Sequence, residues 1–571
     1  MAHRIHGLGV CPGLAIAPQL VLHTQPEAVS PQAVSDVKAE IIRFRRAMAA
    51  VAEQIQSFLA QAKAEIGQTE SEIFEAQFLM LQDPTLTQEV EAEIRTRGLC
   101  AQWCFVQSVQ ARIALLSDSE NAYMQQRVLD LQDIQGQMLD HLMPGGAAQV
   151  RLDGPVILTA QEITPTQLLR FEKKRLAGVL MEEGGATSHT VLLAAAIGVP
   201  CVVGAAEVLA ASRSGQTAVV DGNSGLVLLG PSPEEEGEYR LRLAQLTQAR
   251  AMDEDFRGKP TRTADGAPLT LMCNIASSKE AEDVLPMDGE GVGLFRSEFL
   301  YLSAQSAPSE EEQYQTYLQA ARALRGRPLT VRTLDAGGDK QIAYLDMPQE
   351  ANPFMGFRAI RFCLERPDIF KPQLSALLRA AAQADIRIMF PMIATMDEFR
   401  RAKAVLREVQ EELAAAGVPF RSDIPVGMMV EIPSAAIMAD QFIQEADFFS
   451  IGTNDLLQYL CSADRGNPRT TYLNDPCDPA LLRMIYYTIC QAKACGKEVS
   501  ICGQVAQDAQ LIPLWIGMGV DKLSVSPIQV LRVRRQIAAV DSALWRGHVQ
   551  ELLRLPDAGA VRTRLMELAA R

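Results

Sequence analysis

The chain has 571 residues, of which 48% are hydrophobic and 22% charged, so it is long enough for about three or four domains with buried cores. Its 69 acidic residues outnumber its 54 basic residues, which gives a formal charge of −15 at pH 7. A surface of this sign repels nucleic acid and anionic membranes and argues against a scanning DNA- or RNA-binding protein. A small anionic substrate in a locally basic pocket stays possible.

The cysteines and the amino-terminal residues indicate the compartment. The 11 cysteines are scattered from Cys11 to Cys502 without a Cys-x-x-Cys pair, which argues against a zinc cage or a disulfide framework. The first 22 residues resemble a signal peptide in composition, but Pro12, Gly13 and Pro18 interrupt the apolar run. No run reaches the roughly 18 apolar residues of a membrane span. We therefore expect reduced thiols and a cytoplasmic protein.

After a short strand-like start, residues 30–144 are predicted to be helical. In the first helix, apolar residues recur in alternating steps of four and three, as in a coiled-coil seam, at Val37, Ile41, Phe44, Met48, Val51, Ile55 and Phe58. A second helical stretch, residues 70–95, has an expected break at Pro84 and is strongly acidic. Its acidic face is either a solvated surface or a docking rim for a protein with basic residues.

From Pro155 the pattern changes to a compact α/β unit. Apolar runs at 156–159, 176–181, 199–203 and 217–221 predict buried strands, and residues 190–197 predict an apolar helix. Residues 232–236, Ser-Pro-Glu-Glu-Glu, have the form of a capping box, with proline at the first helical position. This start predicts a linker helix that runs to about residue 256.

Beyond Thr261 the chain alternates between apolar strands and helices. Strands are predicted at 269–275, 291–295, 329–334, 386–391, 426–432, 448–452, 499–502 and 522–525. This order fits a (β/α)₈ barrel. An open doubly wound sheet is the alternative, but no glycine fingerprint of the dinucleotide-binding type follows the first strand.

Polar residues just beyond these strands are the first candidate site, because a barrel carries its active site at the carboxyl ends of its strands. They are Arg296, Arg332, Lys340, Arg358, Glu431, Asn454, Asp455, Arg465 and Cys502. Arginines and a lysine suit phosphate and carboxylate, and two carboxylates suit Mg²⁺. The alternatives are buried ion pairs for the charged residues, and either a core thiol or a proton donor or nucleophile for Cys502.

His189 is the second candidate. It lies in residues 183–190, Glu-Gly-Gly-Ala-Thr-Ser-His-Thr, where glycines permit a tight turn and Thr187 or Ser188 can cap the following helix. A helix amino terminus favours anions, so a phosphoryl group on this imidazole would be stabilised. The alternative is a structural histidine. A nucleophilic histidine and a separate phosphate site suggest phosphoryl transfer between domains.

At this point the motifs match a known family. In order along the chain, the sequence resembles enzyme I of the bacterial phosphoenolpyruvate–sugar phosphotransferase system over essentially its whole length. The motifs that carry the resemblance are Gly-Gly-Ala-Thr-Ser-His189-Thr, Gly291-Val-Gly-Leu-Phe-Arg-Ser-Glu-Phe-Leu300, Arg332-Thr-Leu-Asp-Ala-Gly-Gly-Asp-Lys340, Asn352-Pro-Phe-Met-Gly-Phe-Arg358, Gly427-Met-Met-Val-Glu-Ile-Pro433, Ser450-Ile-Gly-Thr-Asn-Asp-Leu-Leu-Gln-Tyr459, Ala463-Asp-Arg-Gly-Asn467 and Cys502-Gly.

The resemblance implies a chemistry for these residues. His189 would take the phosphoryl group of phosphoenolpyruvate at Nε2 and pass it to the phosphocarrier HPr, releasing pyruvate. Cys502 would protonate the enolpyruvate, and Glu431 and Asp455 would hold Mg²⁺. The remaining candidates would bind phosphate and carboxylate: Arg296, Arg332, Arg358, Arg465, Lys340, Asn454 and Asp455.

The resemblance also implies a domain plan. Residues 1–20 and 148–230 would form an α/β phosphohistidine domain, and 21–147 a helical HPr-docking insertion. Residues 231–260 would form the linker helix, and 261–571 a substrate-binding and dimerising (β/α)₈ barrel. Two positions depart from the family: Gln504 stands where glutamate is common and Asp478 where histidine is common. A dikinase is the nearest rival, but it needs a nucleotide-binding domain for which this plan leaves no residues.

Overall fold

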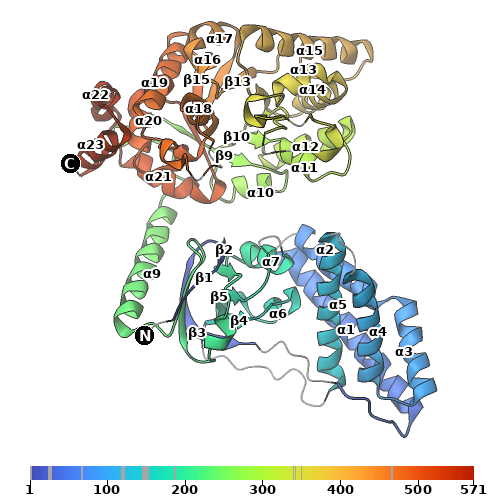
Figure 1. Cartoon of the computed structure of the whole chain (residues 1–571). Coiled ribbons are helices and arrows are strands. Elements are labelled where there is room, and N and C mark those ends of the chain that lie inside the picture. The colour runs from blue at the N-terminus through green and yellow to red at the C-terminus, as the bar shows by residue number, and fades with distance from the viewer. Residues whose placement is uncertain are drawn as a thin grey trace. The chain divides into compact units, whose positions relative to one another are not determined.

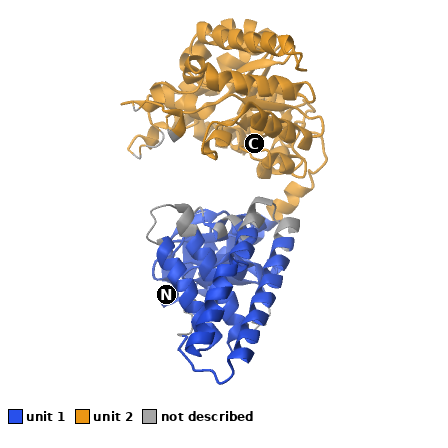
Figure 2. Ribbon diagram, turned by 90° about the vertical axis from the view of Figure 1, so that its right-hand side faces the viewer, with its two compact units in different colours: residues 1–247 blue, residues 248–571 orange. Residues whose placement is uncertain are grey.

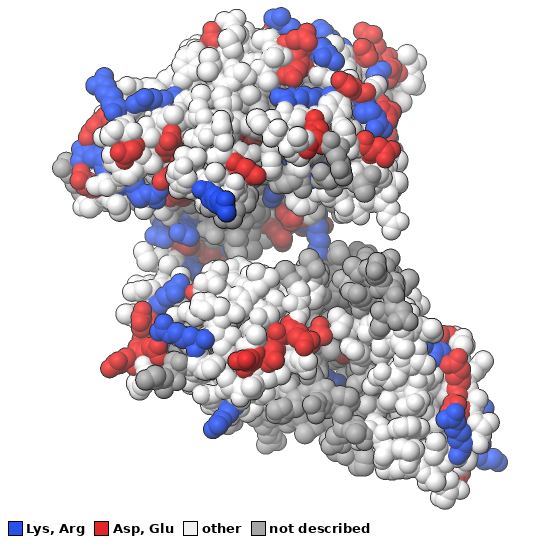
Figure 3. Space-filling view, in the orientation of Figure 1, with Lys and Arg blue, Asp and Glu red and all other residues white. Residues whose placement is uncertain are grey.

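The computed structural model describes residues 3–22, 29–65, 68–117, 122–143, 154–185, 188–338, 340, 342–348, 350–464, 467 and 469–570. The chain divides into two compact units, Met1–Thr247 and Gln248–Arg571 (Figures 1 and 2). On the face shown in Figure 3, basic and acidic side chains lie interspersed over the barrel unit, so the charge there is mixed. Among the helices within these ranges, none has the length and apolar character to span a membrane.

The first unit contains an eight-stranded mixed sheet of order β1-β8-β7-β3-β4-β5-β6-β2. Its strands are β1 His3–His6, β2 Leu8–Cys11, β3 Leu14–Val21, β4 Val156–Ala160, β5 Leu176–Met181, β6 Cys201–Val203, β7 Thr217–Asp221 and β8 Leu226–Leu229. Strands β3 to β6 are parallel neighbours, and the other pairs are antiparallel. All four predicted strands are confirmed; β6 begins later than expected, after Pro200, which cannot donate a ladder hydrogen bond.

Short helices and one apolar helix pack on this sheet. They are α6 Pro165–Leu169, the 3₁₀ turn η1 Lys173–Arg175, α7 His189–Ile197 and α8 Val208–Ala211. The apolar helix predicted at 190–197 is therefore α7, which begins one residue earlier. Ser188 precedes it, and its Oγ accepts a hydrogen bond from the Val191 amide at 3.4 Å. Of the two predicted capping residues, Ser188 is the one that caps; Thr187 lies outside the described residues.

Five helices inserted between β3 and β4 form a bundle, α1 Val37–Glu65, α2 Gln68–Leu81, α3 Pro84–Arg97, α4 Ala101–Ser117 and α5 Ala122–Leu142. The predicted seam of α1 is confirmed, because Phe44, Val51 and Ile55 are fully buried. The predicted break at Pro84 is also confirmed: Asp83 caps α3, with Pro84 in its first turn. The core of this bundle is continuous with the helix-covered side of the sheet.

Helix α9, Pro233–Glu254, follows β8. The predicted capping box is present, since the Glu235 amide donates to Ser232 Oγ at 3.2 Å and the Ser232 amide donates to Glu235 Oε2 at 3.0 Å. None of its residues is buried, and Tyr239 and Leu243 are the side chains that pack on Leu14, Val219 and Leu228 of the sheet. The helix is therefore mostly solvated, as a linker helix would be.

The second unit is a closed barrel of eight parallel strands, which confirms the predicted (β/α)₈ fold and excludes the open sheet. Its strands are β9 Thr270–Ile275, β10 Val292–Arg296, β11 Leu329–Arg332, β12 Ile386–Phe390, β13 Val426–Val430, β14 Phe448–Ile451, β15 Glu498–Ile501 and β16 Lys522–Val525. Both faces of each strand are buried, one by side chains inside the barrel and the other by the surrounding helices. That is why the strands appear in the sequence as apolar runs rather than alternating ones.

Helices surround the barrel (Figure 1). They are α10 Glu280–Val284, α11 Glu298–Leu302, α12 Glu310–Ala323, α13 Ile360–Glu365, α14 Pro367–Ala381, α15 Met396–Ala415, α16 Pro433–Ile437, α17 Ala439–Glu445, α18 Thr453–Leu460, α19 Pro479–Ala494, α20 Ile512–Met518, α21 Val530–Ala538, α22 Ser542–Leu553 and α23 Ala558–Ala569. Short 3₁₀ turns occupy Ala343–Leu345, Pro353–Met355, Thr471–Leu473, Gln504–Gln507 and Pro527–Gln529.

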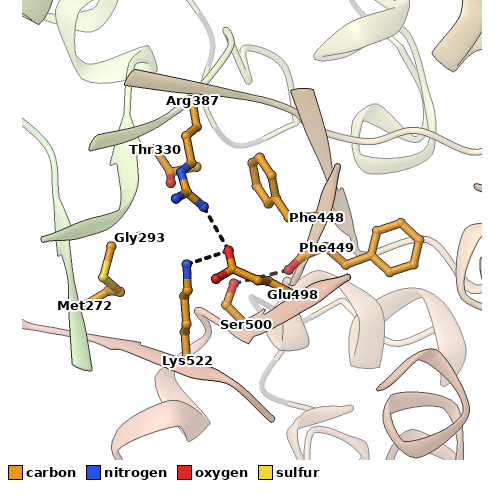
Figure 4. Close-up of a pocket in the computed structure, with 9 residues that line it drawn as sticks. All are labelled: Met272, Gly293, Thr330, Arg387, Phe448, Phe449, Glu498, Ser500 and Lys522. Carbon is orange, nitrogen blue, oxygen red and sulfur yellow. Dashed lines mark hydrogen bonds and ion pairs between the residues drawn. The ribbon is translucent and has the colours of Figure 1, made fainter. Parts of the chain in front are cut away.

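The amino end of the barrel is closed by charged side chains around a small cavity (Figure 4). Glu498, the first residue of β15, contacts Arg387 of β12 at 2.9 Å and Lys522 of β16 at 2.8 Å. The cavity measures about 20 Å³, which leaves room for about one water molecule. This end of the barrel is therefore plugged.

Candidate active site at the carboxyl ends of the barrel strands

Two buried carboxylates and three cations meet at the carboxyl end of β11. Arg332, its last residue, contacts Glu298 Oε1 at 2.6 Å and Asp335 Oδ2 at 3.1 Å. Lys340 Nζ contacts the same two oxygens at 2.9 and 3.1 Å, and Arg358 Nη2 contacts Asp335 Oδ1 at 2.9 Å. Glu298 and Asp335 are fully buried, and the nearby cations lower the pKa of Asp335 below its ordinary value despite that burial.

The loop after β11 brings these groups together. Gly337 has φ +110°, which favours glycine, and a Cβ on it would lie 2.4 Å from Arg358 Cβ. The close approach lets Arg358, only 1% exposed, pass behind the loop and reach Asp335. Arg358 Nη1 also donates to the Tyr459 hydroxyl at 3.1 Å, and that hydroxyl donates to the Phe354 carbonyl. The arginine is thus held by the loop after β11 and by Tyr459 of α18, which is itself bonded to the 3₁₀ turn Pro353–Met355.

Glu431, immediately after β13, is 1% exposed. Its Oε1 accepts the Met392 amide at 2.6 Å; Met392 has φ +56°, an uncommon backbone conformation for a non-glycine residue. Its Oε2 is buried with no hydrogen-bond partner among the described residues. Burial, followed by repulsion from Asp455 and Asp335, raises the pKa of Glu431 to about 8. An oxygen in this state calls for a proton or a cation.

Cys502 follows β15 and is 6% exposed. Its Sγ donates to the Ile451 carbonyl at 3.4 Å. Burial raises the pKa of this thiol to about 11, and the nearby charges of Glu431, Arg332 and Asp455 act on it with smaller effects. The thiol is therefore protonated at neutral pH and lies in the same electrostatic environment as the buried charges.

The remaining barrel candidates surround this group. Arg296 ends β10 and lies 5.2 Å from the Phe299 ring centre, in a cation–π contact. Asn454 and Asp455 are in the first turn of α18 rather than on β14, which ends at Ile451. The charge of Asp455 acts on Glu431, Arg332 and Arg358, so its carboxylate is near all three. Arg465 lies outside the described residues.

His189 belongs to the other unit, where it is the first residue of α7. Its side chain lies outside the part of the chain that the structure describes. The prediction that His189 lies in the first turn of a capped helix is confirmed, and its chemical role stays a prediction. The barrel candidates that the structure describes are thus gathered in one place, and His189 is separate from them in the chain.

The motifs quoted from the sequence contain Glu298, Asp335 and Tyr459, but sequence reasoning gave no role in this site to these three residues or to Met392. Glu298 and Asp335 lie two and three residues from Arg296 and Arg332, so carboxylates spaced closely after strand-end arginines were an available signal. Tyr459 and Met392 act through a hydroxyl and a main-chain amide that only the fold brings into place. No residue pattern could have revealed them.

Glu431 and Asp455 are the pair that fits a divalent cation. Within the described residues, no group of three or more His, Cys, Asp or Glu side chains forms a metal cage. Mg²⁺ does not need one, because it commonly uses one or two carboxylates together with water and substrate phosphate. The unpartnered Oε2 of Glu431 and its raised pKa are what a bound cation would relieve. The residues present therefore fit Mg²⁺.

Comparison with known proteins accounts for this arrangement. The family described as PEP-utilising enzyme, PEP-binding domain, matches residues 250–542. PEP-utilising enzyme, N-terminal, matches residues 6–127, and PEP-utilising enzyme, mobile domain, matches residues 152–225. The first match covers the barrel strands and every described candidate residue of the barrel site.

Whole proteins also align with the chain. It is 40% identical over 534 residues to proteins named phosphoenolpyruvate-protein phosphotransferase from Bacillus sp. (strain S) and Geobacillus stearothermophilus, covering 93% of this chain and 92% of each relative. It is 39% identical over 541 residues to the protein of that name from Bacillus subtilis (strain 168), covering 94% of both. The chain therefore belongs to the family of phosphoenolpyruvate-protein phosphotransferases.

Proposed function

We propose that the chain transfers the phosphoryl group of phosphoenolpyruvate to His189 and then to a histidine of an HPr-type carrier, the first step of a sugar phosphotransferase system. The observation that carries the proposal is the buried group of Arg332, Arg358 and Lys340 around Glu298 and Asp335, in a chain of this family. Phosphoryl transfer depends on alignment and charge neutralisation more than on covalent machinery. Preorganised cations supply both.

The cations would hold the substrate at two points. Arg296, Arg332, Arg358 and Arg465 would bind the phosphate and carboxylate, because guanidinium groups donate bidentately to both. Lys340, Asn454 and Asp455 would complete the pocket. Arg332 and Arg358 are already fixed by carboxylates, so little side-chain freedom is lost when substrate binds.

Glu431 and Asp455 would hold Mg²⁺. When bound, the ion supplies charge neutralisation for the phosphoryl oxygens. The protein keeps Glu431 in place through the Met392 amide, which leaves Oε2 available.

The reaction then divides between His189 and Cys502. The Nε2 lone pair of His189 attacks phosphorus, the P–O bond to the enol oxygen breaks, and the enolate of pyruvate remains. Cys502, whose pKa is about 11, gives its proton to the enolate carbon, and the thiolate takes a proton from solvent. Gln504 is exposed at the start of its 3₁₀ turn, and its amide is not an acid that could donate a proton in that last step.

The other parts of the chain take roles that follow from the same proposal. Residues 1–20 and 148–230 would be the phosphohistidine domain, and 21–147 would dock the carrier, whose basic side chains would contact the acidic helices. Residues 231–260 would link this part to the barrel at 261–571, through which a cytoplasmic homodimer would form.

The test is a labelling experiment with ³²P-phosphoenolpyruvate and Mg²⁺. We expect an acid-labile protein label, one pyruvate released per label, and transfer of the label to HPr from Bacillus subtilis; His189→Ala should abolish all three. A wild-type protein that binds phosphoenolpyruvate but takes no label would be a regulator. Formation of phosphoenolpyruvate from pyruvate and ATP without a partner would instead identify a dikinase.

A further inference from the structure

A buried polar cluster joins the helical bundle to the sheet part of the first unit. Asp133 on α5 is 5% exposed, and its Oδ1 accepts the Thr164 hydroxyl at 2.7 Å. Its Oδ2 accepts the Thr166 hydroxyl and Gln77 Nε2, the latter at 3.0 Å. Gln137 Nε2 donates to Thr166 Oγ1 at 3.2 Å. We call these five residues the Asp133 cluster; it connects α2 and α5 to the start of α6.

The same backbone segment also holds the first turn of α7. The Ile163 carbonyl, next to Thr164, accepts the Thr190 hydroxyl at 2.5 Å. Thr190 is 5% exposed and follows His189 directly. A chain of hydrogen bonds therefore runs from Asp133 on α5, through residues 163 and 164, to the residue beside His189. Helix α6 contacts α7, and through Thr166 it is hydrogen-bonded to Asp133 of α5 (Figure 1).

Burial of the Asp133 carboxylate costs free energy, so stability alone does not explain the cluster. A buried carboxylate is destabilising when its oxygens lack donors, and burial raises the pKa of Asp133 even though Thr166, Thr164 and Gln77 donate to it. Well-packed apolar residues often stabilise such a site at least as well as polar groups do. What apolar residues cannot supply is direction, because hydrogen bonds fix the angle and spacing of the groups that they join.

We propose that the Asp133 cluster is a positioning device, which sets the helical bundle against the first turn of α7 so that a carrier docked on the bundle presents its histidine to His189. The inference rests on the proposed function. It assigns to Thr164, Thr166 and Thr190 a part in the second half-reaction, the transfer to the carrier. Phosphoenolpyruvate would be bound by barrel residues, none of which belongs to the cluster.

Thr166 offers the sharpest test because it is fully buried, donates to Asp133 and accepts from Gln137. Thr166→Val keeps the shape and removes the hydroxyl, and Thr166→Ser keeps the hydroxyl. For Thr166→Val we expect labelling of the protein by ³²P-phosphoenolpyruvate within about twofold of wild type, but single-turnover transfer to Bacillus subtilis HPr about tenfold slower, as misplaced reactants produce. The HPr concentration at half-maximal rate should change little, and Thr166→Ser should restore transfer.

A double-mutant cycle tests whether the Thr166 hydroxyl of the Asp133 cluster and the Thr190 hydroxyl act together. Thr190→Val removes the bond to the Ile163 carbonyl, with Thr190→Ser as its matched control. If the two hydroxyl groups position His189 through the same hydrogen-bonded segment, the double variant Thr166→Val/Thr190→Val should slow transfer by less than the product of the two single fold reductions. This cycle remains informative if one single variant is too unstable to assay alone at 37 °C, because all rates can be measured at lower temperature.

The remaining outcomes count against the inference. Equal losses in labelling and transfer, a serine variant as slow as its valine counterpart, or multiplicative effects in the cycle would reduce the cluster to a stabilising one and overturn the inference alone. A wild-type protein that takes the label and never passes it to a carrier would overturn the proposed function, and this inference with it.

Discussion

Both ends of the barrel carry carboxylates close to cations, but the carboxylates differ in burial and in the direction of their pKa shifts. At the amino end, one carboxylate, Glu498, lies between Arg387 and Lys522, its side chain is 50% exposed, and its pKa is lowered despite partial burial because Lys522 and Arg387 stabilise its charge. At the carboxyl end, Glu298 and Asp335 are fully buried, and Glu431 has its pKa raised to about 8. The Glu498 carboxylate is thus stabilised by two cations, whereas Oε2 of Glu431 has no hydrogen-bond partner among the described residues.

The two ends therefore differ in whether their carboxylates have partners that stabilise the negative charge. This property, rather than the presence of a cavity, distinguishes the structural end of the barrel from the candidate active site. The small cavity lies at the amino end, where two cations already stabilise the single carboxylate of Glu498 (Figure 4). The carboxyl end has a buried carboxylate oxygen without a donor among the described residues. A carboxylate whose pKa is strongly raised among other buried charges is therefore the better guide to the site.

The largest difference is expected when an arginine is replaced by lysine at each end of the barrel in turn. Arg358→Lys loses the fork that holds Asp335 and the Tyr459 hydroxyl, and should lower kcat/KM for phosphoenolpyruvate by about 10³. Arg387→Lys keeps a cation beside Glu498 and should change kcat/KM by less than about twofold. Steady-state pyruvate release measures both. Equal effects at the two ends would remove the distinction drawn between them.

Cys502→Ser should slow pyruvate release by about 10², since a serine hydroxyl is a far weaker acid than a thiol. The thiol must be protonated to act, and its pKa is about 11, so activity that depends on it should persist through pH 9 and fall only as the pH approaches 11. The exposed Cys495→Ser is the matched control. A profile that falls near pH 8.5 and disappears in Cys502→Ser would contradict the raised pKa.

Without Mg²⁺, the charge state of Glu431 should make stability depend on pH. The pKa of Glu431 is about 8 in the folded state and about 4.3 in an unfolded chain, so the folded state binds more protons between these values. Stability should therefore fall as the pH rises from about 5 to 8. Added Mg²⁺ should restore it, and Glu431→Gln should remove this contribution and the response to Mg²⁺. Thermal unfolding of wild type and variant, with and without the ion, checks this; an unchanged Mg²⁺ response in the variant would place the ion elsewhere.

The smallest effect is expected for Glu498→Gln. It leaves Arg387 and Lys522 close together without their carboxylate, and should lower the free energy of unfolding by about 1 kcal/mol, as partly exposed ion pairs do. Activity should remain within about twofold of wild type. Denaturant unfolding and pyruvate release measure the two quantities. A large loss of activity at unchanged stability would mean that the amino end takes part in the chemistry.

Much of this comparison was predictable from the sequence, and the rest was not. The strand-helix alternation predicted the barrel, and its carboxyl ends predicted Arg332, Arg358, Glu431 and Cys502 as neighbours. The pairing of Arg358 with Asp335 depends on the glycine turn at Gly337, whose approach to Arg358 is a property of the folded loop. Met392 holds Glu431 through its main-chain amide, and the identity of a residue does not reveal where its main-chain amide will point.

The central claim is that phosphoenolpyruvate binds at the carboxyl end of the barrel and reacts with a histidine elsewhere in the chain. Calorimetric titration of His189→Ala with phosphoenolpyruvate and Mg²⁺ tests it most directly, because binding is then separated from phosphorylation. We predict one substrate bound per chain in His189→Ala, binding lost when Arg358→Lys is added, and binding kept when Arg387→Lys is added instead. Binding that disappears with His189→Ala alone, or survives the addition of Arg358→Lys, would contradict the account.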